Sequence, residues 1–362
     1  MFLKSISNFR GLAILLIVAG HLYVFGLSGA DILSTFVRNL MGSGTSFFVF
    51  VSGFMFHHVY YKRYGFRQFM SKKFKNVALP YLILGTIAVV FFLITSYGYF
   101  APVNQLSSEE FSNLYEVGIF KPSDTTFMTI LKYYYTGRIS TIYWYIPFAM
   151  LLFLCSPLHM AFIRLKLKEQ LSILVLLYVL ALFVHRPLLN LNPFHSLFYF
   201  TPMYLIGVLT SLYSTNIKRF LDNKLLLMLV VIIGLSLIQQ LLGHEGAYNK
   251  YFFEYGGVDL QLIQKTICVF FLFVALEKYT FKWKILDVIS ETSFAIYFLH
   301  PWLIYVLKKV YTKIGILPDD GNNNILLYLF SLLLVTFLST ASALMIKRLF
   351  KHSSKTRYII GY

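Results

Sequence analysis

Long apolar stretches recur along this chain, and they constrain its fold more than any other feature. A helix needs about 20 predominantly apolar residues to cross a bilayer. Stretches near that length lie at 7–27, 42–60, 77–98, 141–162, 170–184, 196–213, 225–242, 260–277, 288–307 and 324–346. They are continuously apolar rather than alternating, which favours helices over membrane strands. The sequence therefore predicts an all-α polytopic membrane protein with about ten transmembrane helices.

The composition excludes several classes of protein. Charged residues make up 13% of the chain and hydrophobic residues 58%, whereas a soluble domain carries about 25% charged residues. A soluble enzyme and a nucleic-acid-binding domain are therefore poor interpretations, and the expected partner is the lipid bilayer. The chain has no Walker loop, no dinucleotide fingerprint and no HExxH motif, so we predict no metal site. We expect a single transmembrane domain over residues 1–362.

The basic residues predict the orientation of the chain. The net charge is +17, and loops rich in Lys and Arg remain on the cytosolic side. Placing the N-terminus in the cytosol puts most of the 32 basic residues inside, including those at 62–75, 164–168, 218–224, 278–284 and 347–357. One loop is an exception, because it would place Lys308, Lys309 and Lys313 outside. We therefore expect both termini in the cytosol and a multi-pass protein of the plasma (inner) membrane.

Two ionisable residues in the first apolar stretch are the strongest functional candidates. Arg10 and His21 are eleven residues apart, which places them on one face of a helix with a rise of about 16 Å. A guanidinium at the cytosolic mouth suits phosphate groups, and a deeper histidine suits proton transfer or nucleophilic attack. The alternative is that Arg10 anchors the topology by snorkelling and that His21 makes a helix contact.

This pair begins a series of motifs that resembles the integral-membrane acyltransferase 3 family. Arg-x10-His at Arg10 and His21 is followed by an aromatic run at 47–54 that ends in Ser-Gly-Phe. A basic segment at 69–76 precedes Pro80-Tyr81, and a Trp-aromatic motif lies at 144–147. Ser-x-x-x-Tyr-x-x-His lies at 293–300. The resemblance extends from residue 7 to about residue 305, and the order and spacing of the motifs carry it.

The resemblance implies an enzyme that moves an acyl group from cytosolic acyl-CoA to a hydroxyl of a surface polysaccharide or lipid-linked sugar. The transferred group is expected to be acetyl or succinyl. Acyl-CoA would be a co-substrate rather than a permanently bound cofactor. His21 would act as the general base or as an acylated relay. Arg10 would hold the donor together with Lys72, Lys73 and Lys75. In this basic segment the family usually carries arginines, and lysine lacks their bidentate fork.

The remaining motif residues are expected around His21, each with a structural alternative. Ser52, Gly53 and Ser293 are predicted to form the acyl pocket, although Ser52-Gly53 also suits a close helix contact. Ser293, Tyr297 and His300 share one helix face, which suits either a lined cavity or a polar helix contact. The acceptor side is predicted to contain five residues: Arg138, Trp144, Tyr145, Tyr297 and His300. Trp144 and Tyr145 also suit an interfacial aromatic belt.

Two other functions remain as alternatives. A transporter or flippase for a lipid-linked sugar or polysaccharide would suit ten spans with charges inside them, although the chain shows no internal repeat. A non-catalytic subunit of a polysaccharide-synthesis complex is the second alternative. The sequence also leaves open a homodimer.

Overall fold

The computed structural model describes residues 4–29, 31–101, 118–140, 142–279, 282–317, 323–350 and 356–362. The first half contains α1 (Lys4–Ala19), η1 (Tyr23–Phe25), α2 (Ile32–Met41), α3 (Thr45–Met55), η2 (Phe56–Tyr60), η3 (Tyr61–Arg63), α4 (Phe66–Lys73), η4 (Phe74–Ala78), α5 (Leu79–Thr95), η5 (Gly98–Phe100), α7 (Thr126–Thr136), α8 (Tyr145–Leu154), α9 (Ser156–Arg164) and α10 (Leu167–Val184). The second half contains β1 (Arg186–Pro187), η7 (Leu188–Asn190), α11 (Pro193–Leu212), α12 (Ser214–Leu221), η8 (Asp222–Lys224), α13 (Leu225–Leu241), β2 (Asn249–Lys250), α14 (Leu260–Lys278), α15 (Lys284–Ile314), α16 (Ile325–Leu349) and α17 (Thr356–Ile360). The described chain is thus predominantly helical with two strands of two residues each, and the predicted all-α class is confirmed.

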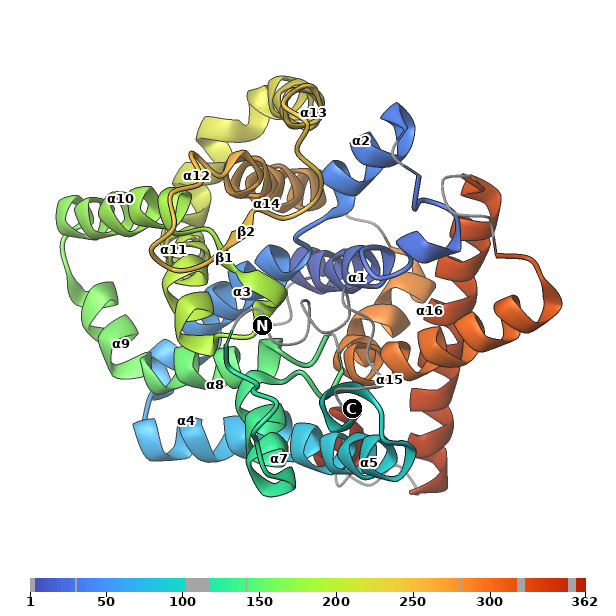
Figure 1. The fold of residues 1–362 in the computed structure, drawn as a ribbon. Helices are drawn as coiled ribbons and strands as arrows, with labels where there is room; N and C mark the ends of the chain where they lie inside the picture. The colour runs from blue at the N-terminus through green and yellow to red at the C-terminus, as the bar shows by residue number, and fades with distance from the viewer. Residues whose placement is uncertain are drawn as a thin grey trace.

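The helices form a bundle with a buried interior and an apolar outer surface. Figure 1 shows α1 near the centre, with α5, α10, α13 and α16 around the periphery. The peripheral helices expose large apolar side chains, among them Leu226, Leu241 and Leu333. Exposed apolar surface of this extent is expected of helices that face lipid. The chain is therefore a membrane protein, as the apolar stretches predicted.

The number of spans is not confirmed as ten. Within the described residues, six helical stretches are long and apolar enough to cross a membrane. They are Ile32–Arg63, Phe66–Phe100, Leu167–Val184, Ser214–Leu241, Leu260–Lys278 and Ile325–Leu349. The pair α8 and α9 makes a seventh if counted as one span, with a bend of 52°. The inner helices α1, α11 and α15 are not among them, and α1 has only 16 residues.

Several apolar stretches fold differently from one straight helix. The first stretch ends as α1 at Ala19, and His21 lies in the following turn, where its backbone N–H donates to the Val18 carbonyl at 3.0 Å. The fourth stretch breaks at Cys155, because Pro157 has no N–H to donate and its ring clashes with the preceding turn. The predicted loop 99–140 contains α7, whereas residues 102–117 lie outside the described residues.

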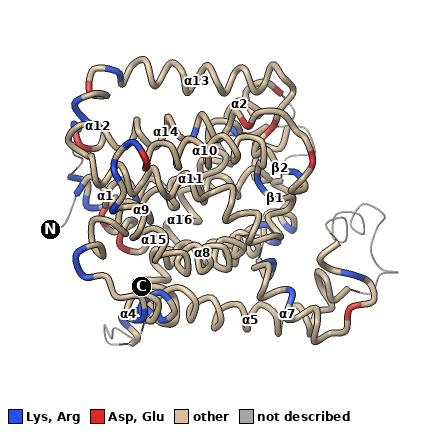
Figure 2. Tube along the Cα trace, turned by 90° about the vertical axis from the view of Figure 1, so that its left-hand side faces the viewer, with Lys and Arg blue, Asp and Glu red and all other residues tan. Residues whose placement is uncertain are grey.

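Charged residues gather at the two ends of the bundle. In Figure 2 the labelled C-terminus lies at the same end as α4 and α12, whereas β1 and β2 lie at the opposite end. Both α4 and α12 end in basic residues. The orientation of the chain, with both termini and the basic end in the cytosol, stays a prediction.

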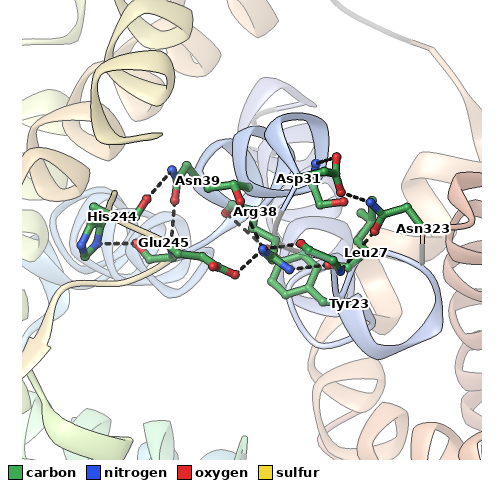
Figure 3. A network of polar contacts seen from close by, with 12 residues as sticks. Tyr23, Leu27, Asp31, Arg38, Asn39, His244, Glu245 and Asn323 are labelled. Carbon is green, nitrogen blue, oxygen red and sulfur yellow. Dashed lines mark hydrogen bonds and ion pairs between the residues drawn. The ribbon is translucent and has the colours of Figure 1, made fainter. Parts of the chain in front are cut away.

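A polar network at the opposite end fixes α2 against its neighbours (Figure 3). The buried Arg38 guanidinium donates to the carbonyl oxygens of Leu27 at 2.6 Å and Gly29 at 2.8 Å, and it forms an ion pair with Glu245. The Asp31 carboxylate caps α2 by accepting from the backbone N–H groups of Leu33 and Ser34. These backbone hydrogen bonds hold the pKa of Asp31 below its usual value.

Candidate active site

Arg10 is held on the interface between α1 and α15. Its Nε donates to Ser293 Oγ at 3.1 Å, and its Nη2 donates to the Ser290 carbonyl oxygen. Ser7 adds a 2.9 Å hydrogen bond to the Ser290 hydroxyl from one turn earlier in α1. A guanidinium carries five N–H donors, so these two bonds orient Arg10 and leave the others for a ligand. The arginine is therefore positioned by the protein rather than extended toward the membrane surface.

Arg10 lies on the wall of a large cavity near the basic end of the bundle. The cavity has a volume of about 590 Å³. Among its lining residues are Ser52, Lys73, Ser293, Lys347, Arg357 and Glu291. The wall thus carries four cationic side chains and one acidic side chain, together with both serines that were predicted to form the acyl pocket.

Among the described residues, the four cations of this cavity have no carboxylate partner within ion-pair distance. The ion pairs among the described residues all involve other lysines and arginines. The Lys73 ammonium lies 4.3 Å from the centre of the Phe153 ring and 5.4 Å from that of Tyr60. Since unpaired cations that share a cavity repel one another, the cavity is suited to a polyanion.

His21 lines a second, small cavity deeper in the bundle. That cavity has a volume of about 20 Å³ and is bounded by Ile17, Thr45, Ile142, Trp144 and Tyr297 among others. Its volume exceeds the roughly 10–15 Å³ that one water molecule requires, but it is too small for an acyl group. No hydrogen bond joins the His21 ring to another of the described residues. The ring is therefore free to act on a ligand.

Three aromatic residues lie between the two cavities. Phe48, Tyr145 and Phe294 line both the large cavity and the small one. They form the partition that separates Arg10 from His21. A thin group that passed between these rings would reach His21 from the cationic cavity.

His300 lies beside His21. The ring centroids are 5.8 Å apart with an interplanar angle of 42°. His300 Nδ1 lies 2.7 Å from the Ile296 carbonyl oxygen, and its buried Nε2 has no hydrogen-bond partner among the described residues. The Tyr297 hydroxyl donates to the Ile142 carbonyl at 2.7 Å, which joins α15 to the residues before α8. Of the residues predicted on the acceptor side, Tyr297 thus lines the His21 cavity and His300 contacts the His21 ring.

The other predicted residues differ in which cavity they line. Trp144 and Tyr145 are buried on the wall of the His21 cavity and not at an exposed outer interface. Lys72 and Lys75 line a neighbouring pocket of about 480 Å³, which shares Asn76 with the large cavity. Arg138 lies between α7 and α8 and lines neither cavity within the described residues.

Gly53 lies at the contact between α3 and α11. A Cβ at Gly53 would lie 1.9 Å from the Tyr204 carbonyl oxygen, and one at Gly207 would lie 2.1 Å from that of Phe50. The two glycines therefore allow the backbones of α3 and α11 to touch. The structure assigns Gly53 this packing role and does not place it on either cavity.

Three cations at or beside the two cavities were not predicted from the sequence as site residues. Lys347 and Arg357 line the large cavity, although they were predicted only to help orient the chain in the membrane. The Arg186 guanidinium lies 5.3 Å from the centre of the Trp144 ring and donates to Asn190 Oδ1 at 2.9 Å. Arg186 follows α10, far from every other motif, so no local signal connects it to Trp144. Among the described residues, no group of His, Cys, Asp and Glu side chains could hold a metal ion.

A comparison with known protein families shows the family to which the chain belongs. The acyltransferase 3 family, described as an acyltransferase domain, matches residues 3–344. The chain belongs to the acyltransferase 3 family. No curated protein and no solved structure matches the chain. This membrane acyltransferase therefore contains both motif residues, Arg10 and His21, inside its family domain, whereas Lys347 and Arg357 lie beyond the matched residues.

Proposed function

We propose that this acyltransferase moves an acetyl or succinyl group from cytosolic acyl-CoA to a hydroxyl of a surface polysaccharide or lipid-linked sugar. The observation that carries the proposal is the pair of adjoining cavities. One is lined by unpaired cations and the other by His21, with Phe48, Tyr145 and Phe294 between them. An acyl-CoA has the matching form, because its charged nucleotide and its thioester lie at opposite ends of a thin arm.

The cationic cavity would hold the nucleotide end of the donor. Coenzyme A carries three phosphate groups, and charge-assisted hydrogen bonds to such groups are the strong ones. Arg10 and Lys73 lie on this wall, and neither forms an ion pair with a carboxylate of the described residues. Lys72 and Lys75 line the neighbouring pocket and would attract the donor from a greater distance. The thioester end would then extend between the aromatic rings toward His21.

Two chemical steps at His21 are compatible with this arrangement. In the first, a ring nitrogen takes the proton of the acceptor hydroxyl, the hydroxyl oxygen attacks the thioester carbonyl, and the C–S bond breaks with the proton passing to the CoA sulfur. In the second, the ring nitrogen itself attacks the carbonyl and releases CoA as the thiol. The acyl-imidazole then passes its acyl group to the acceptor hydroxyl and recovers the ring.

The acceptor would approach from the opposite end of the bundle. A pocket of about 340 Å³ at β1 and β2 is lined by Asn192, His195, Tyr251, Phe253 and Glu254 among others. Aromatic faces beside hydrogen-bonding groups suit sugar rings. The adjacent Arg186 lies over Trp144, which also lines the His21 cavity. This route would bring a sugar hydroxyl toward His21 from the side opposite to the donor.

The proposed setting is the plasma (inner) cell membrane, where acyl-CoA is available on one side and surface glycans on the other. A homodimer or a polysaccharide-synthesis complex would suit such a protein, because the acceptor is made at the same membrane. The transporter or flippase alternative has no support from the family match.

One assay tests the proposal. Purified protein in detergent receives acyl-labelled acetyl-CoA or succinyl-CoA, and release or transfer of the label is followed. The wild type should consume the thioester, and His21→Ala should lose about 10²–10⁴-fold in rate while it still binds CoA. A His21→Ala variant that retains a third of wild-type turnover would contradict the role of His21. Label that stays on wild-type protein without acceptor, and not on the variant, would favour the relay over the base.

A further inference from the structure

The segment 356–362 packs into the helix bundle beside the cationic cavity. Its helix α17 (Thr356–Ile360) contacts α5 and α15. Thr356 and Ile360 are buried, and Ile360 packs with Ala295 and Ala343. Gly361 has φ +78°, and a Cβ there would lie 2.4 Å from Phe294 Cδ1. The segment is therefore fitted against Phe294, one of the three aromatics between the two cavities.

This segment and the adjacent end of α16 supply half of the cavity's positive charge. Arg357 and Lys347 both line the cavity that contains Arg10 and Lys73. The Lys347 ammonium lies 4.1 Å from the centre of the Tyr362 ring. Neither side chain belongs to an ion pair within the described part of the chain. Glu291, the one acidic side chain on the wall, cannot balance four cations.

A purely structural role explains this charge poorly. Segments that serve only to seal a bundle gain stability from apolar contacts, and like charges gathered on one wall oppose that gain. Guanidinium groups are instead preferred wherever phosphate is recognised, because their donors match its oxygens. Two arginines and two lysines around one cavity therefore indicate a ligand with several phosphates.

We propose that segment 356–362 is part of the donor site and that Arg357, with Lys347, binds phosphate groups of acyl-CoA. This inference rests on the proposed function, since it takes acyl-CoA as the ligand of the cavity. It extends the donor site beyond residues 3–344, the part of the chain that matches the family. The donor affinity of this chain would thus depend on residues that the family motifs do not contain.

A binding experiment with a matched control tests the inference. Affinities for CoA, dephospho-CoA and pantetheine are measured on purified full-length protein in detergent for wild type, Arg357→Ala and Arg348→Ala. Arg348 is the control because it adjoins Lys347, carries the same charge and is exposed outside the cavity. We expect Arg357→Ala to bind CoA about 10–100-fold more weakly, as loss of a charged hydrogen bond predicts. Arg348→Ala should match wild type, and pantetheine, which lacks the nucleotide, should not distinguish the variants.

Each contrary result has a distinct meaning. Wild-type CoA affinity in Arg357→Ala would overturn the inference and leave the proposed function intact. Failure of wild type to bind CoA at all would remove the proposed function. An anionic lipid headgroup could supply the same phosphate, so binding to phosphatidylglycerol vesicles is measured in parallel. An Arg357 effect on vesicle binding alone would also overturn the inference. Thermal unfolding checks each variant, and Lys347→Ala and Arg357→Gln replace Arg357→Ala if it does not fold.

Discussion

His21, in the turn that follows α1, lies beside His300 of α15, with ring centroids 5.8 Å apart. The Ile296 carbonyl 2.7 Å from His300 Nδ1 can only accept, so Nδ1 carries the proton. The buried Nε2 lone pair is then left without a partner among the described residues. A small shift of either ring would let an N–H of His21 donate to it. Catalytic hydrogen bonds commonly tighten in this way when substrate binds.

We therefore expect His300 to position His21. His300→Ala should lower kcat for acyl transfer about 10-fold, because the orienting hydrogen bond is lost, and should leave KM for acyl-CoA unchanged. His300→Gln retains an acceptor oxygen and should recover part of the rate. Steady-state kinetics on both variants check this. A His300→Ala enzyme with altered KM and normal kcat would place His300 on the donor path instead.

Arg10 provides a second prediction, because the protein has already fixed its guanidinium. Arg10→Lys keeps the charge but replaces the planar fork, whose separate nitrogens bind Ser293 and Ser290, with a single nitrogen. We expect CoA affinity to fall about 10–100-fold, the cost of a charged hydrogen bond. Titration of CoA into the detergent-solubilised variant measures this. Equal affinities for wild type and Arg10→Ala would leave Arg10 as a topology anchor.

The lysines of the basic segment should differ in how their contribution to CoA binding depends on salt. Lys73 lines the cationic cavity, whereas the exposed Lys72 and Lys75 line the neighbouring pocket. Exposed charges are screened beyond about 10 Å at 0.1 M salt. The double variant Lys72→Ala/Lys75→Ala should therefore weaken CoA binding at low salt and match wild type at high salt. Lys73→Ala should stay weaker at both salt concentrations, and identical salt dependences for the two variants would contradict the separation.

A stability prediction follows from the contact between α3 and α11. Gly207→Ala should destabilise the bundle by at least about 1–3 kcal/mol, the usual cost of overpacking, because its methyl group would meet the Phe50 carbonyl. Gly234→Ala in α13 is the control. No atom lies within 4 Å of a Cβ there, and alanine should stabilise that helix by about 0.5–1 kcal/mol. Thermal unfolding in detergent should move in opposite directions for the two variants.

Regular patterns in the sequence predicted the helical class and the family. The length of an apolar stretch identifies helices that face lipid, such as α10 and α13, because the apolar bilayer requires apolar side chains along the whole helix. It fails for α1, which ends at Ala19, and for the α8–α9 pair, which bends by 52° at Cys155. In those elements the ends are set by neighbouring helices and by Pro157, which a count of apolar residues does not weigh.

The site was predicted only where its residues belong to local motifs. Arg10, His21, Tyr297 and His300 lie in such motifs, and the structure brings all four to the two cavities or beside them. Arg357 reaches the cavity from a separate segment, and Arg186 reaches Trp144 through tertiary packing. Contacts between distant segments leave no periodic signal. For the same reason the sequence did not decide the role of Gly53. Its Ser-Gly-Phe motif suits a pocket and a helix contact equally well, and the contact with α11 is tertiary.

The orientation of the bundle provides the last prediction, because the donor site depends on it. Single cysteines at Tyr255, 83% exposed near β2, and at Asn223, exposed between α12 and α13, probe opposite ends of the bundle. They are introduced after Cys155 and Cys268 are replaced. Excess Lys and Arg remain on the cytosolic side, so Tyr255→Cys should react with a membrane-impermeant thiol reagent in intact cells. Asn223→Cys should react only after permeabilisation. The reverse result would place Arg10, Lys73, Lys347 and Arg357 outside, away from cytosolic acyl-CoA, and would overturn the proposed direction of transfer.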